Sequence, residues 1–346
     1  MNNNDYRITR HPILIGALIV WAGWLVLMIS GDHWRFFKTD WFMSVTMAFG
    51  SFIAGATSEG GGAVAFPVMT LLFGIKPHIA RDFSLMIQSV GMMAATFTII
   101  CLKIPVEWRA ILYAGIGGVI GVAIGIDVIS PLMSPAYTKI FFTSTWLSFA
   151  AALYWINRYH DREVHIAIAN FAPKHIIVLI VIGVIGGAVS GITGSGLDIV
   201  TFSLLVLSYR INEKIATPTS VVLMGMNALA GFIWKEGFSG GMAADAWQYW
   251  YVCIPIVVLG APAGAWFIKN RSRLFIAGFL YFSVVVQYIA ALIILPINSR
   301  LIIFSLSVLA IGVLFFHQMS RFGERRLVWL NNNKLNSELI AVKKLK

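Results

Sequence analysis

Long runs of apolar residues limit what this chain can fold into more than any other feature. Two of them are "HPILIGALIVWAGWLVLMIS", residues 11–30, and "WLSFAAALYWIN", residues 146–157. A helix needs about 20 apolar residues to cross the hydrocarbon core of a bilayer. Charged residues make up about a quarter of soluble domains, against 12% of this chain. Because backbone groups in hydrocarbon must be satisfied within the protein, as in helices, we predict an all-α polytopic membrane protein.

Apolar windows predict where the membrane segments lie. They cover residues 12–30, 41–73, 80–102, 108–130, 133–157, 175–209, 214–234, 244–268, 273–295 and 299–317. The first window follows a basic start, but it is too long for a signal-peptide core and lacks a small-residue cleavage site. We therefore retain it as a membrane helix.

The end of the chain, residues 321–346, is rich in Lys and Arg. The positive-inside rule places such a tail in the cytosol. The tail contributes to the net charge of +11. We interpret the tail as an anchor at the lipid bilayer and do not take the charge as a sign of a nucleic-acid surface. A specific lipid or protein partner for the tail is the alternative.

Two windows are too long for one helix, and each is interrupted by glycines. Residues 41–73 contain "TSEGGG", and residues 175–209 contain "TGSG". Glycine is a poor helix former and tolerates positive φ. Each window is therefore predicted to form two half-helices joined by an unwound turn.

The two interruptions are similar to each other, and they lie 136 residues apart. This shift, without a gap, aligns identical residues on both sides of the interruptions: Gly50 with Gly186, Gly55 with Gly191, Thr57 with Thr193, Gly60 with Gly196, Val64 with Val200, Phe66 with Phe202, Ile75 with Ile211, Ile79 with Ile215, Ala80 with Ala216 and Ser84 with Ser220. Collinear matches at one fixed spacing indicate an internal duplication.

The duplication predicts the organisation of the chain. An N-terminal helix and loop (1–40) precede repeat 1 (41–157), a basic loop (158–174), repeat 2 (175–295), a C-terminal helix (296–320) and the basic tail (321–346). Each repeat has a broken or re-entrant helix followed by three helices. If the broken segments cross the membrane, the repeats run parallel; if they re-enter, the repeats are inverted. The inverted arrangement leaves slightly more Lys and Arg on the cytosolic side, so we expect it.

Irregular backbone at membrane depth has to be buried in protein or line a cavity, since hydrocarbon cannot bond its polar groups. An inverted pair of helix breaks near the midplane is typical of a secondary transporter, and the half-helix starts at such breaks favour anions. The candidate substrate ligands are polar or backbone donors at the breaks and on the following helices: Thr57, Ser58, Gly60, Gly61, Gly62, Gln88, Thr193, Gly194, Ser195, Gly196, Ser220 and Asn227. Gln88 and Asn227 fit a role as hydrogen-bond glue between helices equally well.

Glu59 and Asp198 place carboxylates inside the two interruptions. An intramembrane carboxylate costs about 3 kcal/mol or more and is functional by default. Our hypothesis is that one of them couples proton movement to anion movement, because a protonated carboxyl does not repel an anion. As alternatives, such a carboxylate caps the start of a half-helix, or both bind a cation in a cation/proton antiporter.

Other features are interpreted as structural. Gly117, Gly121 and Gly125 lie four residues apart, which predicts a small-residue packing face. Arg81 and Asp82 are interpreted as a surface pair at a helix start. Cys101 and Cys253 have no metal-ligand spacing, so we expect neither a disulfide nor a metal or cofactor.

An intramembrane enzyme would need Ser195 as a nucleophile with a base within reach. The histidines of the apolar windows, His175 and His317, both stand at helix ends. We therefore do not expect an enzyme.

The glycine interruptions and their flanks resemble those of the sulfite exporter TauE/SafE family. The family's first signature is Gly-x-Gly-Gly-Gly, an apolar run and a proline; Gly60, Gly61, Gly62 and Pro67 match it, whereas Ser58 replaces the first glycine and Glu59 fills the variable place. In the second half Gly194 and Gly196 match, and Leu197, Asp198 and Ser203 replace the two glycines and the proline. The resemblance implies ion-gradient-driven transport of sulfite, sulfonates or related small anions across the bacterial inner membrane, by a monomer or a homo-oligomer.

Overall fold

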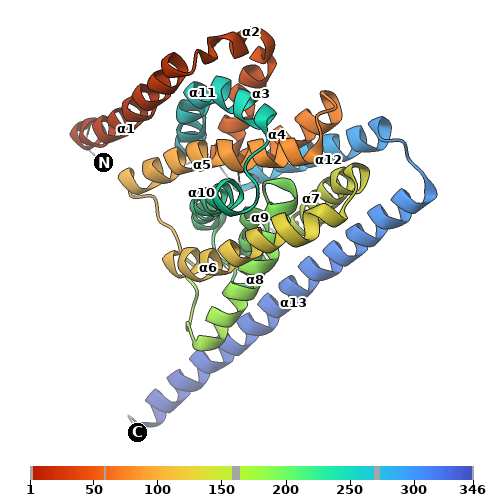
Figure 1. Cartoon of the computed structure of the whole chain (residues 1–346). Coiled ribbons are helices and arrows are strands. Elements are labelled where there is room, and N and C mark those ends of the chain that lie inside the picture. The colour runs from red at the N-terminus through yellow and green to blue at the C-terminus, as the bar shows by residue number, and fades with distance from the viewer. Residues whose placement is uncertain (1–2, 58–59, 158–163, 269–272, 345–346) are drawn as a thin grey trace.

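The computed structural model describes residues 3–57, 60–157, 164–268 and 273–344, and within them the chain forms helices joined by short loops (Figure 1). The long helices are α1 (Asn3–Ser30), α5 (Pro77–Cys101), α6 (Trp108–Ile124), α7 (Pro135–Asn157), α8 (Pro173–Thr193), α10 (Glu213–Phe238), α11 (Ala244–Ile268), α12 (Arg273–Ile294) and α13 (Ser299–Lys344). The shorter ones are α2 (Phe36–Thr39), α3 (Trp41–Ala56), α4 (Gly60–Pro67) and α9 (Leu197–Ser203). Within these residues, seven helices are long and apolar enough to cross a membrane. The prediction of an all-α, multi-pass membrane protein is confirmed.

The first interrupted window forms a helical hairpin from α3 and α4. The chain leaves α3 at Thr57 in an extended conformation, φ −133° and ψ 173°, and α4 packs back along α3. A Cβ built on Gly50 of α3 would lie 3.5 Å from the side chain of Val64 of α4. The ring of Phe42, at the start of α3, lies 4.4 Å from that of Phe73, which follows the hairpin. The hairpin therefore ends beside the place where it begins.

The second interrupted window forms a similar hairpin from α8 and α9. Gly194 ends α8 with φ +86°, a left-handed conformation that favours glycine. The backbone N–H of Leu197 then donates to the hydroxyl of Ser190 at 3.0 Å, which holds α9 against α8. At the other end the ring of His175 lies 5.6 Å from that of Tyr209. Both half-helices end in a π-helical turn, Val68–Leu72 and Leu204–Ser208, again 136 residues apart.

Glycines bring α6 and α8 into backbone contact. A Cβ on Gly117 would collide with the carbonyl of Ile180, and one on Gly121 with that of Val184. Gly125 makes the same close approach to Ala188. The predicted small-residue packing face is confirmed, and its partner is the helix that leads into the second break.

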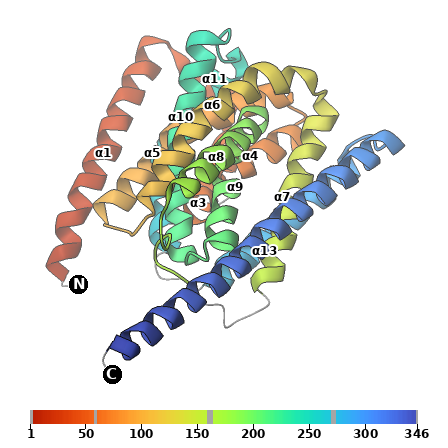
Figure 2. The ribbon, with the colours of Figure 1, turned by 90° about the horizontal axis from the view of Figure 1, so that it is seen from below.

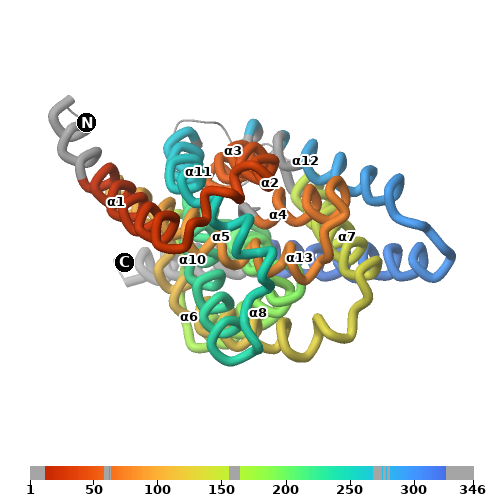
Figure 3. Tube along the Cα trace, turned by 45° about the horizontal axis from the view of Figure 1, so that its top comes forward, coloured from red at the N-terminus to blue at the C-terminus, as the bar shows by residue number. Residues whose placement is uncertain are grey.

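The hairpins lie inside the bundle, and the terminal helices lie outside it. Figure 2 shows α13 running along α7 at one side and α1 at the opposite side. Both outer helices expose apolar side chains, such as Ile19 of α1 and Ile311 of α13, as expected for surfaces that face lipid. The tube in Figure 3 shows α11 beside α3, where Gly55 closely approaches the carbonyl of Ala261. The residues around the two breaks are thereby enclosed by protein.

Candidate functional site

The two helix breaks meet, and the side chain of Gln88 lies between them. Its amide Nε2, from α5, donates to the carbonyl oxygen of Gly194 in the second break at 2.7 Å and to that of Ser84 at 3.0 Å. From the first break, Gly62 approaches the same place. A Cβ built on Gly62 would lie 2.6 Å from Nε2 of Gln88 and 3.0 Å from Cβ of Ser195. Only glycine allows this approach, so residues predicted from three separate segments form one cluster.

The start of α9 is occupied by the carboxylate of Asp198. Its Oδ1 accepts the backbone N–H of Ile199 at 3.0 Å, and its Oδ2 lies 3.2 Å from the hydroxyl of Ser195. The N–H of Leu197 is taken by Ser190. This is the capping arrangement expected as the alternative role of Asp198. It also corrects the expectation that this half-helix offers open N–H groups to an anion, since these donors already have partners inside the protein.

Several polar atoms around the breaks are buried and have no hydrogen-bond partner within the described part of the chain. They are Oγ of Ser84, Oε1 of Gln88, and both amide atoms of Asn227. Asn227 reaches the second break from α10, because a Cβ on Gly118 would lie 2.9 Å from its Oδ1 and 2.7 Å from Leu197. Buried polar groups are nearly always paired, so these groups fit a site that a polar ligand or water fills.

Ser84 was absent from the predicted ligands. It lies one turn before Gln88, its side chain is fully buried, and a Cβ built on Gly194 would collide with it. A signal was present in the sequence, because Ser84 is the counterpart of Ser220 at the 136-residue spacing.

Three of the predicted hydroxyl ligands donate to their own backbone. Thr57 donates to Ile53 O at 2.9 Å, Thr193 to Ser195 O at 2.7 Å, and Ser220 to Thr217 O at 2.8 Å. The donors of Thr57 and Thr193 therefore shape the breaks, that of Ser220 bonds within α10, and none of the three is directed at a ligand. Gly60 and Gly61 begin α4, and Gly196 precedes α9. Ser58 and Glu59 lie outside the described residues.

A cavity of about 780 Å³ opens beside the second break. It is bounded by the start of α5, the end of α6, and the end of α10 with the loop that follows it. Ile192 of α8 and Arg81 of α5 both line it. A Cβ on Gly194 would lie 2.9 Å from the carbonyl oxygen of Arg81. The cavity is thus separated from the turn at Gly194 by Arg81, which contacts both.

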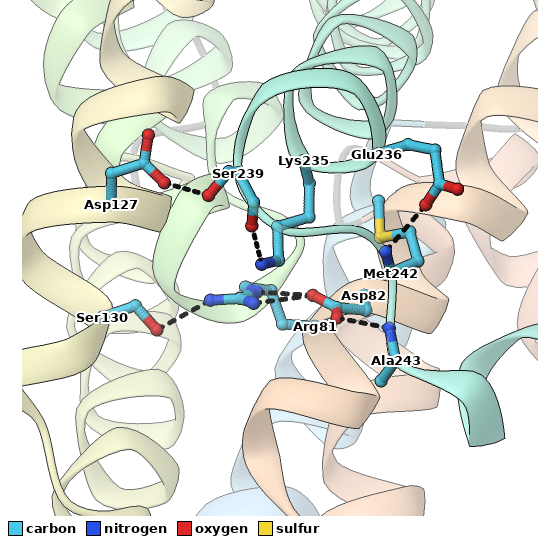
Figure 4. A network of polar contacts seen from close by, with 9 residues as sticks. All are labelled: Arg81, Asp82, Asp127, Ser130, Lys235, Glu236, Ser239, Met242 and Ala243. Atoms are coloured by element: carbon cyan, nitrogen blue, oxygen red, sulfur yellow. Dashed lines mark hydrogen bonds and ion pairs between the residues drawn. The ribbon is translucent and has the colours of Figure 1, made fainter.

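Arg81 and Asp82 are a buried pair, and their interpretation as a surface pair was wrong. They are 5% and 2% exposed. Nε and Nη2 of Arg81 bond Oδ1 of Asp82 at 2.9 and 2.7 Å, and Nη1 donates to Ser130 at 2.9 Å. Oδ2 of Asp82 accepts the N–H of Ala243 at 3.1 Å (Figure 4). The sequence placed the pair at a helix start, but that start is covered by the ends of α6 and α10.

At the far end of α5, a second charged cluster closes the protein around Glu107. Its carboxylate bonds Arg109 at 2.7 Å and the N–H of Ile168 at 2.9 Å, and its own N–H donates to Thr219 at 2.9 Å. Burial acts to raise the pKa of Glu107, but the bonds from Arg109 and Ile168 outweigh it, so the pKa lies below its ordinary value. Glu107 is only 4% exposed. Its bonds join the start of α6, the loop before α8 and α10 at this end of the bundle.

A comparison with protein families decides between the classes that this geometry allows. The model described as "Sulfite exporter TauE/SafE" matches residues 5–143 and 42–288. The chain belongs to this family. The resemblance inferred from the glycine interruptions is confirmed, and a TauE/SafE protein is a membrane transporter of sulfite-like anions. Comparisons with curated proteins and with solved structures found no match.

In this TauE/SafE member, the glycines that carry the family resemblance are those that build the contact at Gln88. Gly62 permits the close approach of α4 to Ser195, and Gly194 supplies both the turn and the carbonyl that Gln88 bonds. The departure at Asp198 lies in the same cluster, where its carboxylate covers the start of α9.

Proposed function

We propose that this chain is a secondary transporter that carries sulfite, a sulfonate or a related small organic anion through a site between the two broken helices. The observation that supports this most strongly is the Gln88 amide bonded to Gly194 beside Gly62, with the unpaired polar atoms of Ser84 and Asn227 nearby. Sites of this kind place a few polar groups inside an otherwise apolar enclosure. The proposal includes no enzymatic activity and no cofactor.

We infer that residues 41–157 and 175–295 are homologous repeats of opposite orientation. The equal 136-residue spacing of the breaks and of the π-helical turns supports the duplication. Each hairpin ends beside its own beginning. The three helices α5, α6 and α7 separate the two hairpins, and an odd number of crossings brings the second hairpin in from the opposite side. The hairpin tips then meet near the midplane, as in other secondary transporters.

Proton coupling at Asp198 follows from its place at the start of α9. As a carboxylate, it takes the N–H groups there and repels an arriving anion. When protonated, it no longer repels the anion. It is then also a weaker acceptor, so the N–H of Ile199 and the hydroxyl of Ser195 become available to the anion. Proton binding and anion binding then favour each other. Glu59 remains a second candidate for the same role, and its place in the first break is proposed from the sequence alone.

The orientation is proposed from the charges at the chain ends. The basic tail, 321–346, lies in the cytosol of a bacterium, with the protein in the inner membrane. Glu107 then closes the cytosolic side, and the cavity at Arg81 opens to the outside. Export requires the protein to alternate between this state and one in which the Glu107 side opens.

Purified protein in liposomes tests the proposal. We expect sulfite or ethanesulfonate to move across the membrane, and an imposed proton gradient to change the rate. Gln88→Ala should abolish most of this flux. Sodium movement without any anion movement would instead support the cation/proton antiporter that uses Glu59 and Asp198.

A further inference from the structure

Two cationic side chains converge in the cavity beside the second break. Figure 4 shows the ammonium of Lys235 above the guanidinium of Arg81 and pointing toward it. Lys235 donates to the carbonyl oxygen of Ser239. Throughout the described chain no carboxylate lies within 4.0 Å of its ammonium. Asp82 neutralises the charge of Arg81, so Lys235 brings to the cavity a positive charge that has no carboxylate partner of its own among the described residues.

The unused hydrogen-bond capacity of the two cations is that of donors. Arg81 has five N–H donors, and its three bonds to Asp82 and Ser130 leave two donors unused. Lysine has three donors, and Lys235 uses one.

The acids that line the cavity are engaged elsewhere. Both oxygens of Asp82 accept bonds, from Arg81 and from the N–H of Ala243. Asp127, at the rim, accepts the hydroxyl of Ser239 and the indole N–H of Trp234. The cations thus keep unused donors at the cavity, while the carboxylate oxygens already accept bonds from neighbouring groups. The formal charges that line the cavity balance, so its preference for an anion rests on these unused donors.

We propose that this cavity is a second anion-binding site, in which Lys235 and Arg81 hold a small oxyanion before it passes to the helix breaks. The identity of the anion rests on the proposed function; the site itself rests on the geometry of the cavity. Arg81, Ser84 and Gln88 follow one another at three- and four-residue spacing and share one face of α5. Seven helical residues span about 10 Å, so this face leads from the cavity to the Gln88 cluster.

Charge-selective labelling tests this site without any need for transport. Met133 lines the cavity, and its side chain makes no polar contact in the structure. We would place a single cysteine there (Met133→Cys), with Cys101→Ala and Cys253→Ala, and compare an anionic ethylsulfonate thiosulfonate reagent with a cationic trimethylammonium one. The anionic reagent should react about tenfold faster, relative to the rates of both reagents with a free thiol. Millimolar ethanesulfonate, an anion that does not react with thiosulfonates, should slow its reaction.

Lys235→Gln and Lys214→Gln form a matched pair for this experiment, because both lie on α10 and remove one positive charge. Lys214 is exposed at the start of the helix, away from the cavity. Lys235→Gln should remove most of the preference for the anionic reagent, and Lys214→Gln should leave it unchanged. Equal rates for both reagents, or a preference that survives Lys235→Gln, would overturn the proposal.

The two proposals fail in different ways. A chain that labels selectively but moves no anion would overturn the proposed function and keep the second site. A chain that moves sulfite but labels without charge preference would do the reverse. Thr138→Cys, on α7 and also facing the cavity, repeats the measurement if Met133→Cys does not fold.

Discussion

The side-chain amide of Gln88 donates a 2.7 Å hydrogen bond to the backbone carbonyl of Gly194, a residue 106 positions further along the chain. This bond joins a continuous helix to an unwound turn, and Gly62 of the other broken segment touches the same amide. A single side chain thus links the two breaks. Any movement of the turn at Gly194 away from α5 has to break or replace this bond.

Gln88→Ala should impair transport far more than folding. The loss of one hydrogen bond to a buried carbonyl costs about 1–3 kcal/mol of stability, whereas the unlinked breaks no longer hold their mutual geometry. We expect at least a tenfold fall in sulfite flux in liposomes, with the protein still monodisperse in detergent. Gln287→Ala is the control, because the bond that Gln287 makes among the described residues is to Ser283 on its own helix; equal losses in both variants would contradict the role of Gln88.

Gly62→Ala should have a similar effect for a steric reason. The added methyl group would lie 2.6 Å from the Gln88 amide and 3.0 Å from Cβ of Ser195, so the amide must leave its place and the two breaks must separate slightly. The expected result is a large fall in anion flux. Gly115→Ala provides the control, since its nearest neighbour would be an ordinary 3.8 Å away in Leu223. Full activity of Gly62→Ala would show that close contact of the breaks is not required.

Asp198→Asn should remove the pH dependence of anion binding. The amide keeps the size of the carboxyl but carries no charge, so it cannot repel the anion at high pH. Binding of ethanesulfonate, whose own charge does not change with pH, should weaken in the wild type as pH rises and remain constant in the variant. Asp245→Asn, at an exposed position of α11, controls for the loss of a carboxylate. An unchanged pH dependence in Asp198→Asn would exclude Asp198 and leave Glu59 as the coupling group.

Glu107→Gln should loosen the closed end of the bundle in a pH-dependent way. Because the pKa of Glu107 in the folded protein lies below its ordinary value of 4.5, its charge stabilises the fold above about that pH, and the contribution is lost as pH falls through the folded pKa. Arg109 is partly exposed, so we expect only about 1 kcal/mol. Thermal unfolding in detergent should show the wild type more stable at pH 6–7, with the two proteins converging below about pH 4.5. A constant difference at all pH values would show that the charge of Glu107 does not contribute.

The parts of the fold that depend on local pattern were predictable from the sequence. Apolar runs predicted the helices, the glycines of "TSEGGG" and "TGSG" predicted both breaks, and the four-residue spacing of Gly117, Gly121 and Gly125 predicted a packing face. Each of these follows from the composition and period of a single segment.

The parts that depend on which segments meet were not predictable. Arg81 and Asp82 look like an exposed helix start until α6 and α10 cover them. The bond from Asp198 to the start of α9 depends on a side-chain rotamer, and a sequence permits either that cap or a free carboxylate. The 136-residue spacing pairs Ser84 with Ser220, but only the structure places its side chain against Gly194. Such contacts join residues far apart in the chain, and no local period encodes them.

A structure of the protein with bound sulfite tests the site between the breaks most directly. We predict an oxyanion enclosed by the first turn of α4, Ser84 of α5 and the turn at Gly194, within hydrogen-bond distance of the Ser84 hydroxyl. It should be absent from the same position in Gly62→Ala. An anion that binds elsewhere, with the Gln88 cluster closed and empty at saturating sulfite, would contradict the proposed site.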